Sequence, residues 1–150
     1  MSYKITVPQD IPSFSIDLMG GEAAGCDLAL HFNAQFEPEE VAVFNSFQSG
    51  AWGQEERVAP IAFHRGDSFE LFFTVTKAGY QVKVNGTDFH MFAHRIPVEH
   101  VTTMQISGNI NLETVNIFLG GVFDMGCLDP MAVSGSMGGQ WTCEVKEIPM

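Results

Sequence analysis

Basic side chains are scarce in this sequence: 7 Lys and Arg stand against 18 Asp and Glu among 150 residues. The net charge of −11 repels phosphate backbones and anionic lipid headgroups, and no Lys/Arg cluster reverses it locally. Nucleic acid and membrane surfaces are therefore not expected as partners. Long apolar runs are missing as well. Residues 1–7 lack the pattern of a signal peptide, and no stretch of apolar residues is long enough to span a bilayer. We expect cytoplasmic synthesis and no membrane insertion.

Cysteine is also rare. The three residues, Cys26, Cys127 and Cys143, cannot build a disulfide framework, because an odd number leaves at least one thiol free or shared between chains. A reducing compartment fits this count best. The alternative is a single disulfide bridge between Cys127 and Cys143, which would cross-link the C-terminal part of the chain. Thiol titration under denaturing conditions distinguishes these two cases.

Sustained helical periodicity is missing, and hydrophobic residues recur instead with a period of two. The side chains of residues 69–75 alternate between two faces, one of them entirely apolar, and this alternation is typical of a β-strand. Tyr80–Val84 continues this pattern, and Asn85-Gly86 then supplies the positive φ angles of a tight turn before Thr87–Met91. Further predicted strands are Lys4–Val7, Asp27–Gln35, Val41–Ser46, Val101–Ser107 and Asn111–Phe118, and the only helical turn is expected near Pro97–His100. Many short strands with close turns predict an all-β fold, a two-sheet antiparallel β-sandwich.

The length of the chain favours one domain, and 45% apolar residues, including 13 Phe, suffice for a core. From about Gly120 onward the sequence becomes rich in Gly, Met and Ser. We therefore predict a domain over residues 1–120 and a C-terminal Gly/Met-rich extension over residues 121–150. The extension would pack on the domain or at an oligomer interface. Its segment Trp141–Val145 alternates again and is predicted to add an edge strand to its own sheet or to a neighbouring chain.

The predicted strand Asp27–Gln35 has one apolar and one polar face. Leu28, Leu30, Phe32 and Ala34 form the first, and Ala29, His31, Asn33 and Gln35 form the second. Taken alone, the polar face is explained by solvation of an antiparallel sheet. Asn45 on the next strand would share a face with His31 and Asn33 if the two strands pair. That pairing would produce a continuous hydrogen-bonding surface.

A tryptophan follows this surface in the sequence. Trp52 is flanked by small residues, which predicts an exposed indole, and Glu55 and Arg57 come shortly after it. Sugars present apolar C–H groups on one side and hydroxyls at the rim, so an aromatic ring beside amides and an ion pair suits both. Trp52 would stack on the apolar side. Glu55 would accept from hydroxyls while Arg57 holds Glu55 in place and donates its remaining N–H groups.

At these positions the sequence resembles the galectins, whose signature reads H-x-N-x-R, V-x-N and W-x-x-E-x-R. The matching residues here are His31-x-Asn33-x-Gln35, Val43-x-Asn45 and Trp52-x-x-Glu55-x-Arg57. The likeness continues to Phe118 and covers about four-fifths of the chain. It implies a jelly-roll sandwich that binds β-galactosides such as lactose and N-acetyllactosamine without a cofactor. The sugar-binding residues it implies are His31, Asn33, Gln35, Asn45, Trp52, Glu55 and Arg57.

The resemblance also implies partners and a location. The expected partners are glycans on glycoproteins or glycolipids, and nonclassical secretion would bring the protein to them. A single shallow site competes with water for every hydroxyl and binds weakly, so useful avidity requires several sites on one assembly. We therefore predict a homo-oligomer that cross-links glycoconjugates.

One position departs from the galectin signature. Gln35 stands where the family carries Arg, so a charged five-donor group is replaced by a neutral amide. This change should weaken the site or shift its preference among galactosides. The alternative interpretation is a protein-interaction domain of the same fold that has weakened or lost sugar binding.

Two other functions are not favoured by the residues. Five histidines, among them His90 and His94, have no cysteine or carboxylate at ligand spacing beside them, so no metal site is expected. Glu55 and Glu56 are adjacent carboxylates, but neighbours on an extended chain point to opposite sides. A glycosidase needs two carboxyl groups across one bond, so we expect no enzyme activity.

Overall fold

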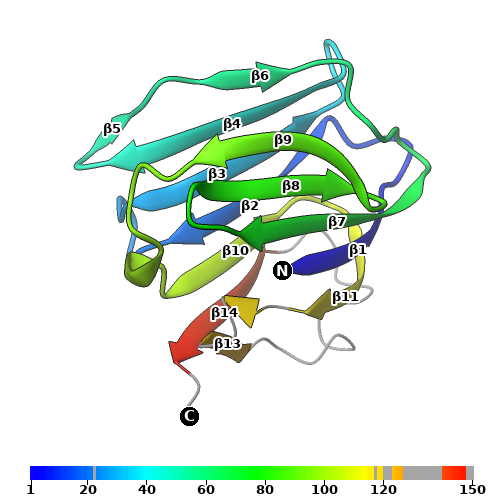
Figure 1. Ribbon diagram of the computed structural model, residues 1–150. Coiled ribbons are helices and arrows are strands. Elements are labelled where there is room, and N and C mark those ends of the chain that lie inside the picture. Colours follow the sequence, from blue (N-terminus) through cyan, green and yellow to red (C-terminus); the bar gives the residue numbers. More distant parts are fainter. Residues whose placement is uncertain (22, 117, 120–122, 127–139, 148–150) are drawn as a thin grey trace.

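The computed structural model describes residues 1–21, 23–116, 118–119, 123–126 and 140–147, and it consists of two antiparallel sheets packed face to face (Figure 1). In order across the first sheet, the strands are β11 (Asn111–Asn116), β1 (Ser2–Thr6), β7 (Ser68–Val75), β8 (Gly79–Val84) and β9 (Thr87–Ala93). In the second sheet they are β12 (Phe118–Leu119), β13 (Phe123–Gly126), β14 (Gln140–Glu147), β10 (Thr103–Ser107), β2 (Ser13–Met19), β3 (Leu28–Gln35), β4 (Val41–Gln48) and β5 (Ala51–Trp52), while β6 (Glu56–Val58) also pairs with β4. The predicted two-sheet antiparallel sandwich is confirmed.

Aromatic rings fill the space between the sheets. The phenylalanines with almost no exposed surface are Phe14, Phe32, Phe44, Phe63, Phe73 and Phe92. Phe63 and Phe69 stack with ring centroids 4.0 Å apart, and the buried Tyr3 hydroxyl donates to the Met104 sulfur at 3.0 Å. Burial of a large apolar side chain contributes roughly 1.5–3 kcal/mol, so this interior is the main source of stability. It provides a rigid support for the outer face of each sheet.

Most predicted local features are present. Asn85 and Gly86 have φ angles of 52° and 82°, as the predicted turn between β8 and β9 requires. The predicted helical turn is the 3-10 helix η1 (Val98–His100). The predicted strand Asn111–Phe118 is divided between β11 and β12, which belong to different sheets. Strands β2, β5, β6 and β13 are additions to the predicted set. Within the described part of the chain, no helix is long and apolar enough to cross a membrane.

The start of β3 corrects one prediction. The sequence pattern predicts Leu28 in the core and Ala29 on the polar face, but Ala29 is buried in the core and Leu28 is only partly buried. The pairing register between β3 and β4 shifts between Leu28 and His31, which is a β-bulge. An extra residue in one strand exchanges the two faces on either side of it. Leu28 therefore lies opposite Phe47, on the same outer face as His31.

The C-terminal strands extend the second sheet. β14 pairs antiparallel with β10 on one side and with β13 on the other, so the segment predicted as an edge strand belongs to this chain's own sheet (Figure 1). The prediction of an edge position was wrong, because β13 covers the far side of β14. The predicted boundary between residues 1–120 and 121–150 stays a prediction. Cys127 lies outside the described residues, and with it the alternative of a Cys127–Cys143 bridge. The Cys26 thiol is free, partly buried, and donates to the Gly21 carbonyl at 3.3 Å.

Candidate functional site

Polar side chains from four strands form a row across the outer face of the second sheet. Gln105 of β10 lies opposite Asp17 of β2. Asp17 lies opposite His31 of β3, which in turn lies opposite Asn45 of β4. Residues paired directly across an antiparallel sheet project their side chains to the same face. The polar residues at alternate positions after His31 continue this surface along β3.

An open groove of about 400 Å³ lies on this face. Its lining residues are His31, Asn33, Gln35, Val43, Asn45, Trp52, Gly53 and Glu55. Six of the seven predicted sugar-binding residues are therefore brought together in one concavity. The seventh, Arg57, lies beside it: its backbone pairs with Val43 of β4, and its guanidinium contacts Glu55.

Trp52 is exposed, as predicted, with 54% of its surface accessible. A tight turn between β4 and β5 presents it, because Ser49 and Gly50 adopt φ angles of 52° and 80° that turn the chain within two residues. The indole meets the Phe47 ring edge to face, with centroids 5.1 Å apart. It meets the His31 ring in the same manner at 5.0 Å. These two contacts fix the orientation of the indole while leaving much of its surface free for a ligand.

The His31 imidazole is oriented by a carboxylate. Its Nδ1 is in hydrogen-bond contact with the Asp17 Oδ1, and Asp17 is largely buried. A neutral imidazole carries one proton, so a proton on Nδ1 that is donated to Asp17 leaves Nε2 as the acceptor. His31 thereby offers a defined hydrogen-bonding group to the groove.

The amides of Asn33 and Gln35 are linked to each other. Gln35 Nε2 donates to Asn33 Oδ1 at 2.8 Å, and Asn33 Nδ2 donates to the Phe14 carbonyl at 3.0 Å. Since they are two residues apart on β3, both side chains lie on the same face. One donor of each amide is used within the protein. The remaining hydrogen of each amide is available for a ligand hydroxyl.

An ion-pair network lies beside the amides. Arg57 donates from Nη1 to Glu55 at 2.9 Å and from Nη2 to Glu39 at 3.0 Å. The hydrogen bond with Glu55 raises the pKa of the Arg57 guanidinium above its ordinary value, with a smaller contribution from Glu39. Glu55 is held in place by this contact and keeps free lone pairs that accept hydrogen bonds.

Glu56 faces the other way, as expected for neighbours on an extended chain. Its two oxygens contact His90 Nε2 at 2.8 Å and Arg95 Nη2 at 2.9 Å, away from the Arg57 partner of Glu55. The adjacent carboxylates therefore have separate partners and do not face one another across a shared space. This geometry does not support glycoside hydrolysis.

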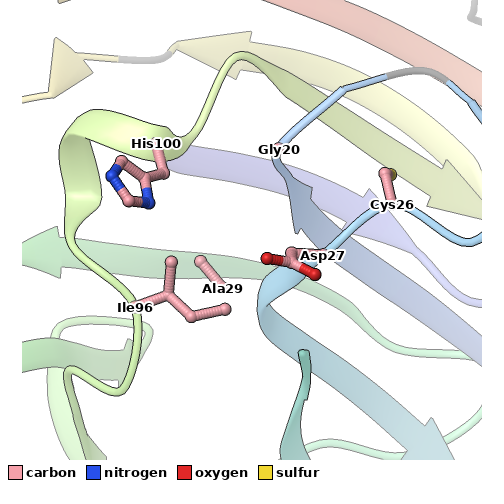
Figure 2. Close-up of a pocket in the computed structure, with 6 residues that line it drawn as sticks. All are labelled: Gly20, Cys26, Asp27, Ala29, Ile96 and His100. Atoms are coloured by element: carbon pink, nitrogen blue, oxygen red, sulfur yellow. The ribbon is translucent and has the colours of Figure 1, made fainter. Parts of the chain in front are cut away.

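A second hollow of about 460 Å³ lies near the start of β3 and η1, and Figure 2 shows its lining. In that view Ile96 and Ala29 lie below His100, and Asp27 lies between Ala29 and Cys26. Asp27 already accepts from the backbone N–H of Ser49 at 3.0 Å. Among the described residues no group of three His, Cys, Asp or Glu side chains could hold a metal ion. The hollow is lined by fewer polar side chains than the groove.

Three residues that shape the site were not anticipated from the sequence: Asp17, Glu39 and Arg95. Asp17 has a recognisable signal, because polar and apolar residues alternate over Ser13–Leu18 as in a strand. Glu39 is one of several acidic residues in a loop, and nothing in the pattern selects it. Arg95 belongs to the segment after β9 and reaches the site only through folding.

Comparison with known proteins gives concordant results. Residues 2–117 match the sequence family described as galactoside-binding lectin. Rat galectin-4 is 43% identical over 108 residues, which are 72% of this chain and 33% of that protein. The chain thus spans about a third of the length of the galectin-4 relative that it matches. Human galectin-7 is 38% identical over 112 residues, 75% of this chain and 82% of that protein.

A solved structure supports the same grouping. The structure of sheep galectin-11 in complex with glycerol superposes on this chain with a TM-score of 0.70 at 31% sequence identity. The superposition covers 75% of this chain and 84% of the sheep chain. The similarity thus extends over most of both molecules.

Proposed function

The chain belongs to the galectins, the family of galactoside-binding lectins, and from this membership we propose that it binds β-galactosides reversibly in the groove beside Trp52. Galectins bind carbohydrate and are not enzymes, so the groove holds its ligand without altering it. The ligands are glycans of the lactose and N-acetyllactosamine type. The proposed contacts come from His31, Asn33, Gln35, Asn45, Trp52, Glu55 and Arg57.

The observation that carries this proposal is an exposed indole fixed next to a row of hydrogen-bonding groups. Trp52 offers a flat apolar surface for the C–H face of a sugar ring. His31 and the amides beside it supply donors and acceptors of fixed orientation, and Glu55 supplies a pure acceptor. Hydroxyls both donate and accept, so a mixed set of this kind satisfies them better than a surface of one type.

Affinity at a single site is expected in the micromolar to millimolar range. The groove is open and its polar groups are hydrated before binding, so each sugar hydroxyl replaces a water molecule. Gln35 lacks the charge that the galectin signature places at this position, which removes one or two charge-assisted hydrogen bonds. The amide keeps a donor for the ligand, so binding is weakened rather than lost.

A calorimetric titration with two disaccharides tests the proposal. Lactose and cellobiose differ only in the orientation of one hydroxyl on the terminal ring, so cellobiose is a matched control. We expect a saturable heat with lactose and none with cellobiose at the same concentrations. Equal heats, or no heat with lactose at high millimolar concentration, would favour a protein-interaction domain that has lost sugar binding.

Cross-linking of glycoproteins or glycolipids by a homo-oligomer is a further part of the proposal. One weak site gains avidity only when several copies are joined in one particle. Light scattering of the purified chain, with and without residues 121–150, measures whether it assembles. A monomer in both samples would remove the cross-linking role. Access to such glycans would require export, which we propose is nonclassical.

A further inference from the structure

Arg95 lies outside the galectin signature and yet contacts the groove from the other sheet. It follows β9, an edge strand of the first sheet, and its side chain reaches the β4–β6 edge of the second sheet. Nη1 donates to Asn45 Oδ1 at 3.0 Å and to Ser46 Oγ at 3.1 Å. Nη2 donates to the Gln54 carbonyl at 2.7 Å and to Glu56 at 2.9 Å. One guanidinium therefore joins four acceptors on β4, on the loop after β5 and on β6.

The guanidinium itself is firmly held. Its central carbon lies 4.6 Å from the centroid of the Phe92 ring, a cation–π contact from its own sheet. Glu56, which neutralises it, is held by His90 on the opposite side. Only 24% of the Arg95 side chain is exposed. A lysine ammonium is a single point charge and cannot reach these four acceptors in one plane.

This contact decides which way the Asn45 amide faces. Asn45 Oδ1 accepts from Arg95 and from the backbone N–H of Ser46, while Nδ2 donates to the Gly53 carbonyl at 3.1 Å. The flipped amide would place two donors against a guanidinium, which has no acceptor. The arrangement leaves one Nδ2 hydrogen unused by these contacts. Asn45 is thus fixed as a hydrogen-bond donor toward the groove.

The loop that carries Trp52 is shaped around the same guanidinium. A Cβ atom at Gly53 would lie 2.8 Å from Arg95 Nη1, so the loop or the guanidinium would have to shift, and it would lie at a tight 3.0 Å from Ser46 Oγ. Glycine therefore permits the backbone to approach Arg95 closely, and the Gln54 carbonyl completes the contact. Residues 52–55 connect the indole to Glu55. By holding this loop, Arg95 supports both Trp52 and Glu55 at the groove.

We propose that Arg95 is a positioning residue of the galactoside site, which sets the donor orientation of Asn45 and anchors the loop between Trp52 and Glu55. The effect of Arg95 on sugar affinity rests on the proposed function, whereas its effect on the orientation of the Asn45 amide does not. Arg95 itself does not contact the sugar. It determines which single hydroxyl of the sugar is recognised by the Asn45 donor.

The test compares Arg95→Met and Arg95→Lys with the matched control Arg65→Met. Arg65 is similarly exposed, at 27%, and pairs with Glu37, but it does not line the groove. Each variant is titrated with lactose and with lactose analogues that lack one hydroxyl in turn. The side-chain NH₂ signals of Asn45 are recorded by NMR in the sugar-free protein and assigned with Asn45→Asp. Thermal unfolding is measured in parallel.

We expect Arg95→Met to weaken lactose binding about tenfold, as for loss of one oriented hydrogen bond, and Arg95→Lys to weaken it less. We expect Arg65→Met to change the unfolding temperature but to keep lactose affinity within about twofold of the original. The deoxy penalty is the loss of affinity that an analogue shows relative to lactose. In Arg95→Met this penalty should disappear for one analogue only, and the same analogue should lose its penalty in Asn45→Ala. The two Asn45 NH₂ signals, resolved in the original protein, should shift and broaden.

The proposal is overturned if Arg95→Met keeps both the Asn45 NH₂ signals and every deoxy penalty of the original protein. If the methionine variant does not fold, Arg95→Lys is judged by the same two measurements. It is also overturned if Arg65→Met weakens lactose binding equally, because the effect would then be one of general stability. If the original protein does not bind lactose, the proposed function fails. The Asn45 signals in the sugar-free protein then decide the role of Arg95 alone.

Discussion

The indole of Trp52 and the imidazole of His31 meet edge to face, with ring centroids 5.0 Å apart and ring planes inclined by 60°. This contact joins the apolar wall of the groove to the polar row across β10, β2, β3 and β4. The imidazole is held from behind by Asp17, and the indole is held from its other side by Phe47. Both rings are therefore oriented before a ligand arrives, which lowers the entropic cost of binding.

Replacement of Trp52 should remove sugar binding and leave the fold intact. Trp52→Ala deletes the stacking surface, and because 54% of the residue is exposed, little core packing is lost. We expect no detectable heat with lactose in calorimetry and an unfolding temperature close to that of the original protein. Trp52→Phe, which retains a smaller ring, should bind with intermediate affinity. An alanine variant that binds lactose normally would exclude the indole from the site.

Restoring the charge at position 35 should tighten binding. Gln35→Arg replaces the bond to Asn33 with a guanidinium that can donate several charge-assisted bonds, each contributing about 1.5–3 kcal/mol. We expect lactose affinity to rise about tenfold or more in calorimetry. Gln35→Glu, of similar shape but opposite charge, should weaken binding because it removes the amide donor. If the arginine variant binds no better, Gln35 is not a ligand contact.

Asp17→Asn should weaken binding although Asp17 is not part of the predicted motif. The change removes the carboxylate that fixes His31 Nδ1 as a donor, so the imidazole loses its defined orientation. We expect a loss of lactose affinity of about three- to tenfold. Asp27→Asn is the matched control, because Asp27 accepts from the Ser49 backbone and does not line the groove. An equal loss in both variants would contradict a specific role for Asp17.

Alkaline pH should destabilise the fold through its two tyrosines. Burial raises the pKa of Tyr80 to about 12 and raises that of Tyr3 further. A folded-state pKa above the ordinary value of 10.0 means that the stabilising contribution is complete below pH 10 and is lost as pH rises through 12. Denaturant titrations should show falling stability across this range, with tyrosinate absorbance appearing late in the folded protein.

Tyr80→Phe provides the control for this pH dependence. The Tyr80 hydroxyl has no hydrogen-bond partner among the described residues, so its removal breaks no bond in the fold. We expect unchanged or slightly higher stability at neutral pH and a smaller loss between pH 10 and 12. Tyrosine ionisation near pH 10 without unfolding would show that these rings are accessible to solvent.

The fold was largely predictable because its signals are local. Period-two alternation over residues 69–75 and the Asn85-Gly86 turn depend on neighbours in sequence, and both appear as expected. The bulge in β3 was not predictable, because the exchange of Leu28 and Ala29 between faces follows from the register with β4. Strand β2 was missed although its alternation was present.

The residues of the site also fall into those that the sequence predicts and those that it does not. Motif residues such as His31 and Trp52 stand at the spacing of the galectin signature and reach one groove through a single set of neighbouring strands. Asp17 and Arg95 stand outside that signature: Asp17 meets His31 through the pairing of β2 with β3, and Arg95 meets Asn45 across 50 residues of sequence. No spacing rule links such distant positions, since only the packed sandwich brings them together.

The most direct test of a sugar site beside Trp52 is chemical-shift mapping of the backbone and side-chain N–H signals during titration with lactose. If lactose binds in the groove, saturable shifts are expected at the Trp52 indole N–H, at His31 and at Asn45, with the rest of the sandwich unchanged. Shifts confined to the hollow near Asp27 and His100, or no shifts at saturating lactose, would contradict it.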